Sequence, residues 1–350
     1  MHIRSATEKL QAGESLTREE ARAVMGDLLS GSISDPEIIS FLVALRDKGE
    51  QAPEIVGFAE VMRAHASDGL RSAGVDVDGL ARREPLLDTC GTGGDGHGTF
   101  NVSTAVAIVA AAAGIRVAKH GNRSISSRCG SADVLEALGV RLELPLKMIP
   151  ACLEEVGMVF LFAPRLHLAM KHVMNARRSV KTKTVFNLLG PLTNPLRASY
   201  QLVGVYDAAK TEMMARALGE VGVQRAFVAA GSDGIDEITL SGPTRLSMHL
   251  EGKNETREVA PEDFGLERIS LDRFQGGDAA TNAQMLCEVL EGKKGPCRDV
   301  VLANAAAAFT VAGQASTFVE GVRKAAEVLD KGAAARTLAT LVQFTQKNCP

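Results

Sequence analysis

The chain has 350 residues, 45% of them hydrophobic, which is enough for two domains and a sizeable core. Its net charge of −3 gives no global basic field and argues against a nucleic-acid partner. Six scattered cysteines without a CxxC pair favour reduced thiols over zinc or disulfides. The N-terminus lacks the apolar core of a signal peptide, and the alanine-rich run at 102–115 is too short to span a membrane. We therefore expect a soluble, cytoplasmic protein without a membrane partner.

The first 70 residues are predicted to be helical throughout. Thr17 and Glu20 have the spacing of a capping box, and apolar residues recur at helical spacing over 21–29 and 38–45. A small bundle rarely buries several apolar stripes alone. The stripes therefore favour a homodimer through the helical domain, and packing against the chain's own second domain is the alternative.

Residues 71–85 are polar and contain glycine, which indicates a linker, and strands alternate with helices from Leu86 onward. This alternation predicts an α/β fold: a small all-helical N-terminal domain and a large α/β domain over 86–350 with a mostly parallel central sheet flanked by helices. The expected strands are 86–90, 116–118, 140–144, 158–162, 201–206 and 225–229, with a looser, antiparallel segment at 245–250. The expected later helices are 132–137, 150–155, 208–219, 279–291, 299–312 and 316–331.

A glycine-rich turn follows the first predicted strand. Five of the eight residues from Gly91 to Gly98 are glycine, and Asn101, Ser103 and Thr104 then begin an apolar helix. Unpaired N–H groups at a helix N-terminus bind anions, and glycines let the backbone approach a phosphate closely. The spacing matches neither the P-loop nor the dinucleotide fingerprint. We interpret the turn as a phosphate site, with a purely structural turn as the alternative.

A second polar loop follows the next predicted strand, over residues 119–127. It contains two cations, a histidine, an amide and three hydroxyls. Such side chains neutralise and hydrogen-bond phosphate. Because the loop follows a parallel strand, it is expected at the same sheet edge as the glycine turn, although an ordinary surface loop has a similar composition.

Three further segments are candidates for the site. Adjacent carboxylates Asp236 and Glu237 follow a glycine turn and suit Mg²⁺, although such a pair is more often a solvated turn. Arg177 and Arg178 have the charge to grip a carboxylate, whereas His167 and His172 lack a metal-binding spacing. Residues 187–195, NLLGPLTNP, form an unusual rigid loop.

Together these segments resemble the anthranilate phosphoribosyltransferase family of tryptophan biosynthesis. The match covers nearly the full chain. The matching motifs are FLVALRDKGE at 41–50, GTGGDG at 91–96, TFNVST at 99–104, KHGNRSISSRCGSADVLEALG at 119–139, VFNLLGPLTNP at 185–195, GIDE at 234–237 and GGDAATNA at 276–283.

The resemblance implies transfer of the phosphoribosyl group from phosphoribosyl pyrophosphate to the amine of anthranilate. It also implies a helical domain completed by a segment near 165–185, a homodimer, and two Mg²⁺ ions at the pyrophosphate. A partnership with anthranilate synthase is a further possibility within the family. The implied donor residues are Gly91, Gly94, Asp95, Thr99, Asn101, Val102, Ser103, Thr104, Lys119, His120, Gly121, Asn122, Arg123, Ser124, Ile125, Ser126, Ser127 and Ser131. The implied anthranilate contacts are Gly91, Asn122 and Arg177, the implied metal ligands are Ser103, Asp236 and Glu237, and the residues implied in catalysis are Lys119, His120 and Arg177.

The sequence departs from the family near the acceptor. Ala230 stands where many relatives have histidine, and Leu166 and Met170 stand where relatives carry aromatic residues. Two alternatives share the fold: a pyrimidine nucleoside phosphorylase, which should lack the KHGNR motif and the Asp-Glu pair, and a non-enzymatic nucleic-acid-binding relative, which should have a basic face.

Overall fold

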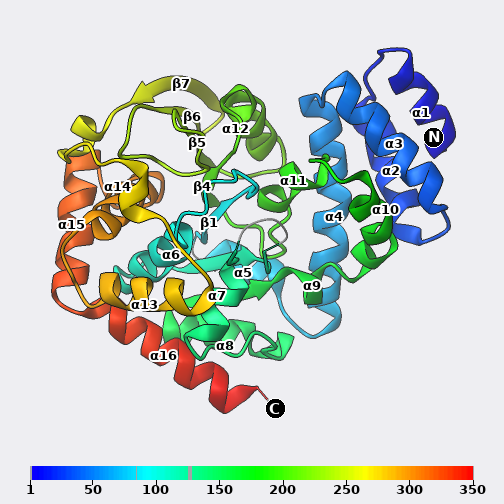
Figure 1. The fold of residues 1–350 in the computed structure, drawn as a ribbon. Coiled ribbons are helices and arrows are strands. Elements are labelled where there is room, and N and C mark those ends of the chain that lie inside the picture. Colours follow the sequence, from blue (N-terminus) through cyan, green and yellow to red (C-terminus); the bar gives the residue numbers. More distant parts are fainter. Residues whose placement is uncertain (1, 84, 125–127, 350) are drawn as a thin grey trace.

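The computed structural model describes residues 2–83, 85–124 and 128–349. Its N-terminal helices form a bundle at one end of the molecule, and a later helix, α10, packs against α3 in this bundle (Figure 1). The predicted capping box is confirmed, because Thr17 and Glu20 each accept a hydrogen bond from the other's backbone N–H. The helices of this region are α1 (Ile3–Gln11), α2 (Arg18–Ser30), α3 (Asp35–Lys48), α4 (Ala52–Ser72), α9 (Ala163–Leu166) and α10 (Met174–Val180).

The apolar stripes of α2 and α3 are satisfied within the chain. Leu28, Phe41 and Leu45 are fully buried, in a cluster that also contains Val203 and Val228 of the sheet. The alternative of packing on the chain's own second domain is therefore confirmed for these stripes, whereas the homodimer stays a prediction that the stripes no longer support.

The described residues of the second region form a seven-stranded sheet with the order β3-β2-β1-β4-β5-β6-β7. The first five strands in this order are parallel, and β6 and β7 are antiparallel additions at one edge. This confirms the predicted fold class. The strands are β1 (Leu87–Gly91), β2 (Val117–Gly121), β3 (Met158–Phe162), β4 (Tyr200–Gly204), β5 (Arg225–Gly231), β6 (Thr244–Leu250) and β7 (Lys253–Val259).

Helices cover both faces of the sheet (Figure 1). On one face, α6 packs against β1 and β2, and α14 packs against β4, β5 and α6. On the other face, α12 packs against β5 and β6 and also contacts α4, which joins the sheet to the bundle. The helices here are α5 (Val77–Arg83), α6 (Val102–Ala112), α7 (Ser131–Ala137), α8 (Ile149–Val156), α11 (Phe186–Leu189), α12 (Thr211–Glu220), α13 (Ala279–Leu290), α14 (Pro296–Val311), α15 (Phe318–Asp330) and α16 (Ala333–Asn348).

The strand predicted at residues 140–144 is wrong. Its apolar residues do alternate inward, with Leu142 and Leu144 buried, but helices satisfy its backbone. The N–H of Arg141 donates to Thr345 Oγ1 of α16, and Arg165 donates to the carbonyl of Leu144. The stretch predicted as a linker also contains a helix, α5. Among the described residues, no helix is both long and apolar enough to cross a membrane.

Candidate active site

The glycine turn and the Asp-Glu pair meet at the carboxyl edge of the sheet. Asp236 Oδ2 accepts a hydrogen bond of 2.7 Å from the N–H of Gly93, and Glu237 Oε1 accepts one of 3.2 Å from the N–H of Ser103. A side chain at Gly91 would collide with the Asp236 carboxylate, which explains the glycine there. Residues that are more than 130 positions apart in the chain therefore form one site.

The carboxylates in this site carry unfavourable charge. Burial, reinforced by Asp95, raises the pKa of Asp236 to about 6. Burial and the neighbouring Asp236 raise the pKa of Glu237 as well. Asp95 Oδ2 is buried and has no hydrogen-bond partner among the residues that the structure describes. These three acidic side chains repel one another, and a bound cation would relieve that repulsion.

Lys119 lies beneath the glycine turn. Its side chain is 1% exposed, and its Nζ donates to the carbonyl of Thr89 and, at 3.2 Å, to Ser103 Oγ. Burial lowers the pKa of Lys119, and the nearby Asp88 opposes this shift. The lysine therefore places a positive charge directly behind the start of α6, where anions are expected.

His120, at the end of β2, pairs with His167. Their Nε2 atoms are 3.1 Å apart, and the carbonyl of Gly190 hydrogen-bonds the His120 ring. Burial lowers the pKa of His120 to about 3 and that of His167 to about 4, so both rings are neutral near pH 7. The pair joins the sheet to the segment that leads into α10.

Arg177 lies on α10 with its guanidinium over the Phe186 ring, 5.7 Å from the centroid. Burial lowers its pKa. In the described part of the chain, no carboxylate forms an ion pair with Arg177. A partly desolvated guanidinium without a counter-ion is suited to an anionic ligand.

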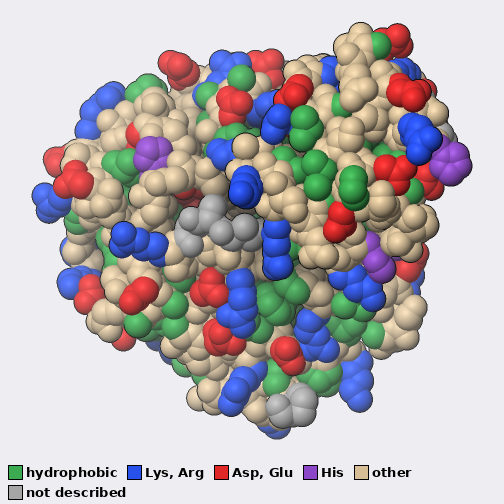
Figure 2. Space-filling model, turned by 45° about the vertical axis from the view of Figure 1, so that its right-hand side comes forward, with side chains coloured by type: hydrophobic (Ala, Val, Ile, Leu, Met, Phe, Trp, Pro, Cys, Tyr) green, Lys and Arg blue, Asp and Glu red, His purple; other side chains and the backbone are tan. Residues whose placement is uncertain are grey.

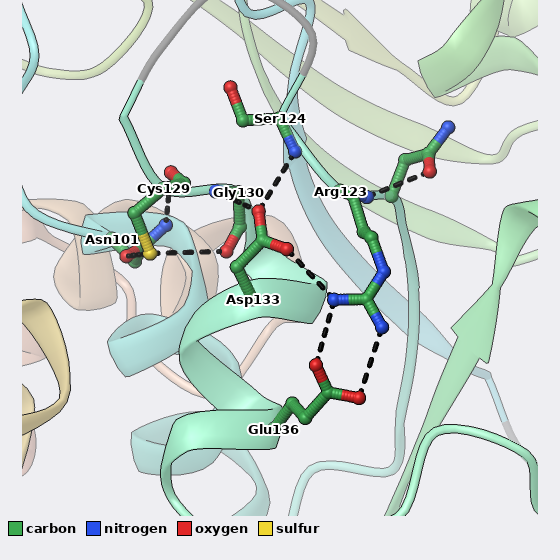
Figure 3. Close-up of polar contacts among 8 residues, drawn as sticks. Asn101, Arg123, Ser124, Cys129, Gly130, Asp133 and Glu136 are labelled. Atoms are coloured by element: carbon green, nitrogen blue, oxygen red, sulfur yellow. Dashed lines mark hydrogen bonds and ion pairs between the residues drawn. The ribbon is translucent and has the colours of Figure 1, made fainter. Parts of the chain in front are cut away.

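Arg123, the second cation of the polar segment 119–127, is paired with carboxylates of α7. Arg123 forms ion pairs with Asp133 (3.0 Å) and Glu136 (2.8 Å) of α7 (Figure 3). Its guanidinium also lies 5.7 Å from the centroid of the Phe162 ring. Asn122 is exposed, and Gly121 ends β2. Of the predicted donor residues, Ile125, Ser126 and Ser127 lie outside the described residues.

Lys and Arg side chains gather around the hollow in the middle of one face of the molecule (Figure 2). The acidic cluster and the buried Lys119 lie together at the sheet edge, and the partly buried Arg177 on α10 is a further cation beside Phe186.

The comparisons with known proteins identify the family. Residues 83–335 match the a/b domain of a glycosyl transferase family, and residues 4–66 match the helical bundle domain of the same kind of protein. The anthranilate phosphoribosyltransferase of Moorella thermoacetica is 48% identical over 345 residues, which cover 98% of this chain and 98% of that protein. This chain belongs to the anthranilate phosphoribosyltransferase family.

Solved structures of the family extend the match to three dimensions. The anthranilate phosphoribosyltransferase of Thermus thermophilus matches with a TM-score of 0.88 and 42% identity, covering 97% of this chain and 99% of that chain. The enzyme of Saccharomyces cerevisiae in complex with PRPP and Mg matches with a TM-score of 0.85 and 28% identity, over 99% and 98% of the two chains. The same yeast enzyme in complex with 4-fluoroanthranilate has a TM-score of 0.86 at 28% identity, again covering 99% and 98%.

The start of α6 is held by Asn282, a residue to which the sequence analysis assigned no role. Asn101 accepts a hydrogen bond of 2.9 Å from the buried Asn282 of α13, and its amide donates to the carbonyl of Cys129. Asn282 Oδ1 in turn accepts from the N–H of Gly277. The GGDAATNA motif contains Asn282, so the family resemblance marked the segment but gave this residue no role.

The remaining predicted donor residues line the same edge. Gly94 and Asp95 are in the glycine turn, and Thr99 bridges to Gln275 beside it. Val102 and Thr104 are buried in the first turn of α6, and the Thr104 hydroxyl has no partner in the described ranges. Ser131 begins α7.

Lys183 is a further cation that the sequence analysis did not single out. Its Nζ lies 3.3 Å from the centroid of the Tyr206 ring, at the end of β4. Burial lowers the pKa of Lys183, and the nearby Asp95 and Asp236 partly oppose this shift. Lys183 therefore shares the electrostatic field of the acidic cluster.

Proposed function

We propose that this chain transfers the 5-phosphoribosyl group from phosphoribosyl pyrophosphate to the amine of anthranilate and releases pyrophosphate. The observation that carries the proposal is the meeting of Asp236 and Glu237 with the backbone N–H groups of Gly93 and Ser103. A diphosphate is bound through a cation and through N–H donors at a helix N-terminus. These hydrogen bonds hold two carboxylates, which are oxygen ligands suited to the cation, against the glycine turn and the start of α6, where such donors are expected.

The donor is assigned to the two loops after β1 and β2. The N-terminus of α6, the glycine turn and the buried Lys119 supply N–H groups and positive charge. The proposed donor residues are the full set named from the family resemblance, from Gly91 to Ser131, with Asn282 holding Asn101 in place. Arg123 belongs to this set by resemblance, although its guanidinium is engaged by Asp133 and Glu136.

Mg²⁺ fits the residues present. Ser103, Asp236 and Glu237 offer oxygen ligands, and the raised pKa values of both carboxylates indicate a site that favours added positive charge. In the described ranges no cluster of three His, Cys, Asp or Glu forms a complete metal site, so substrate oxygens and water must complete the coordination. Two ions at the pyrophosphate are proposed from the resemblance, and bound magnesium would neutralise charge on the leaving pyrophosphate.

The protein's own part in the reaction is positioning and electrostatics. Charge develops on the pyrophosphate oxygens as the bond to ribose C1 breaks, and the fixed N–H groups of the glycine turn and Lys119 are placed to stabilise it. The aromatic amine of anthranilate is unprotonated at neutral pH, so no general base is required before it attacks C1. Holding the amine against C1 then accounts for much of the acceleration.

Anthranilate is assigned to Gly91, Asn122 and Arg177. Arg177 supplies the charge for its carboxylate, supported by the absence of an ion-pair partner among the described residues. His120, neutral and fixed by His167, is proposed to line the path of the acceptor.

A homodimer through the helical domain, a cytoplasmic location and an anthranilate synthase partner complete the proposal. Support for the dimer comes from Leu168, which is 69% exposed beside an apolar cavity of about 300 Å³ bordered by Leu29 and Met62. Light scattering of the full chain at micromolar concentration tests it, and a stable monomer contradicts it.

The decisive experiment is turnover of anthranilate with phosphoribosyl pyrophosphate and Mg²⁺, followed by the loss of anthranilate fluorescence. Phosphorolysis of pyrimidine nucleosides without anthranilate turnover would favour the phosphorylase alternative. A salt-sensitive DNA mobility shift would favour the nucleic-acid-binding alternative.

A further inference from the structure

Two stretches that follow β2, residues 122–124 and residues 128–131, lie against each other. We call this contact the neck and the two stretches its sides. The N–H of Ala132 donates to the carbonyl of Asn122 at 3.2 Å. A Cβ built on Gly130 would lie 2.3 Å from the backbone nitrogen of Ser124, so the two sides are in contact and only glycine fits there.

One carboxylate holds both sides of this neck. Asp133 Oδ2 accepts from the N–H of Ser124 at 3.0 Å and from the N–H of Gly130 at 2.9 Å, and Oδ1 accepts from Arg123 at 3.0 Å (Figure 3). Burial raises the pKa of Asp133, but these hydrogen bonds outweigh burial and leave the pKa below its usual value. The side chain therefore remains an anion at neutral pH.

We propose that Asp133 is a positioning residue for the phosphoribosyl donor, which holds residues 122–124 against residues 128–131 so that the donor contacts on the two sides of the neck keep their spacing. This inference rests on the proposed function, because it takes the loop to be part of the donor site. Asp133 itself touches no substrate, since its oxygens are occupied by the neck.

Glu136 provides a contrast one helical turn further along α7. It binds Arg123 through both oxygens, at 2.8 and 3.0 Å, but within the described residues it makes no hydrogen bond to either backbone side of the neck. Its side chain is 55% exposed, compared with 23% for Asp133. Exposed ion pairs contribute little, whereas hydrogen bonds to a charged, partly buried acceptor are stronger. The neck therefore depends on Asp133 rather than on the ion pair of Arg123.

Three variants of the full chain separate position from charge. Asp133→Asn keeps an acceptor oxygen at the neck and loses the charge. Asp133→Glu keeps the charge and moves the carboxylate by one methylene away from the two N–H groups. Glu136→Gln is the matched control, because it weakens the Arg123 ion pair and leaves the neck intact.

Steady-state kinetics with each substrate varied in turn gives the first readout. We expect Asp133→Glu to raise the donor KM about tenfold, since bonds to charged acceptors are lost, while the anthranilate KM and kcat at saturating donor change less than about twofold. Asp133→Asn keeps an acceptor oxygen but loses the charge that strengthens these bonds, so it should raise the donor KM by less than Asp133→Glu does, whereas Glu136→Gln should stay within about threefold of the wild-type donor KM. Equal changes in both KM values for Asp133→Glu, or a larger donor effect for Glu136→Gln, would overturn the proposal.

Amide hydrogen exchange gives a readout that does not depend on turnover. Exchange at Ser124 and Gly130 should accelerate in Asp133→Glu and stay near wild type in Glu136→Gln, with the rest of the chain unchanged. Unchanged exchange at these two amides overturns the role of Asp133 at the neck. Absence of anthranilate turnover in the wild-type protein would instead contradict the proposed function, and the exchange result would still decide the neck.

Discussion

The helical bundle contains a fully buried carboxylate and the sheet edge contains partly buried ones, and their surroundings differ. In the bundle, Glu54 is fully buried and fully paired: Lys48 lies 2.8 Å away, and the N–H groups of Leu16 and Gln51 donate to its two oxygens. At the sheet edge, Asp236 and Glu237 each accept from one backbone N–H and repel each other.

This difference distinguishes a carboxylate that stabilises the fold from carboxylates that are suited to binding a ligand. The bundle supplies the positive charge for its own carboxylate, so the site is complete in the free protein. The sheet edge places carboxylates together without an ion-pair partner among the described residues, and their pKa values rise. Local groups that remain electrostatically unsatisfied are typical of sites completed by a ligand.

The largest effect is expected at Glu54, the paired carboxylate of the bundle. Glu54→Gln leaves the Lys48 ammonium, 6% exposed, without its counter-ion. We expect the free energy of unfolding to fall by about 3–5 kcal/mol, with the KM values of the remaining folded protein unchanged. Urea unfolding followed by circular dichroism measures this. The exposed pair of Glu288 and Lys293 is the control, because Glu288→Gln should change stability by less than about 1 kcal/mol. Equal effects of the two variants would contradict the contrast.

The opposite response is expected at Glu237. Glu237→Ala should lower kcat about 10²- to 10³-fold at low Mg²⁺ and recover part of the loss at high Mg²⁺, because an electrostatic contact to the leaving group is removed. Glu237→Gln, which keeps an acceptor for Ser103, should not lower the melting temperature without Mg²⁺, since it relieves repulsion with Asp236. Activity measured across a magnesium titration checks the first point. An unchanged magnesium dependence would refute the metal assignment.

The sequence predicted the parts of this comparison that depend on local pattern. Gly93 and Gly94 have positive φ, as a glycine turn requires, and β1 precedes them as expected. The parallel order of strands follows from the alternation of strands and helices, and it places the loops after β1 and β2 at one edge. The roles of Asp236 and Glu237 came from the resemblance, since an adjacent acidic pair by itself is more often a solvated turn.

The parts it missed depend on contacts between distant elements. Asn282 reaches Asn101 across 181 positions, and no local pattern distinguishes it from an ordinary helical asparagine. Residues 140–144 have the alternation of a strand, but α16 satisfies their backbone instead. The apolar stripes of α2 and α3 left two partners open, a second copy or the chain's own second domain, because the surface they pack against, which includes Val203 of β4, is not visible in the bundle's own sequence.

Arg177 extends the contrast to a cation. Its guanidinium is partly buried without an ion-pair partner in the described ranges, so its charge is available to a ligand. Arg177→Ala should raise the anthranilate KM about 10- to 100-fold, because a charged hydrogen bond is worth about 1.5–3 kcal/mol. The donor KM should remain nearly unchanged, whereas Lys119→Ala should raise the donor KM or lower kcat. Parallel changes in both KM values for Arg177→Ala would rule out a dedicated carboxylate contact.

Asp88 is the intermediate case, and its effect is the smallest. It is fully buried beneath the site and hydrogen-bonded by Asn194 and by the N–H of His120, yet burial still raises its pKa to about 6. The folded pKa lies above the unfolded value of about 3.9, so the native state binds this proton more tightly. The stabilisation from this proton is therefore full below about pH 4 and is lost as the pH rises through about 6.

The loss between these two pH values should be on the order of 2 kcal/mol, and Asp88→Asn should remove it, because the amide does not titrate. The free energy of unfolding, measured in urea from pH 4 to pH 7 without Mg²⁺, checks this through its slope rather than its absolute value. The slope matters because the variant also loses a hydrogen-bond acceptor and is expected to be less stable at every pH. An Asp88→Asn slope equal to that of the wild type would mean that the native state does not bind the Asp88 proton more tightly than the unfolded chain does, and would contradict the contrast between this buried carboxylate and a paired one.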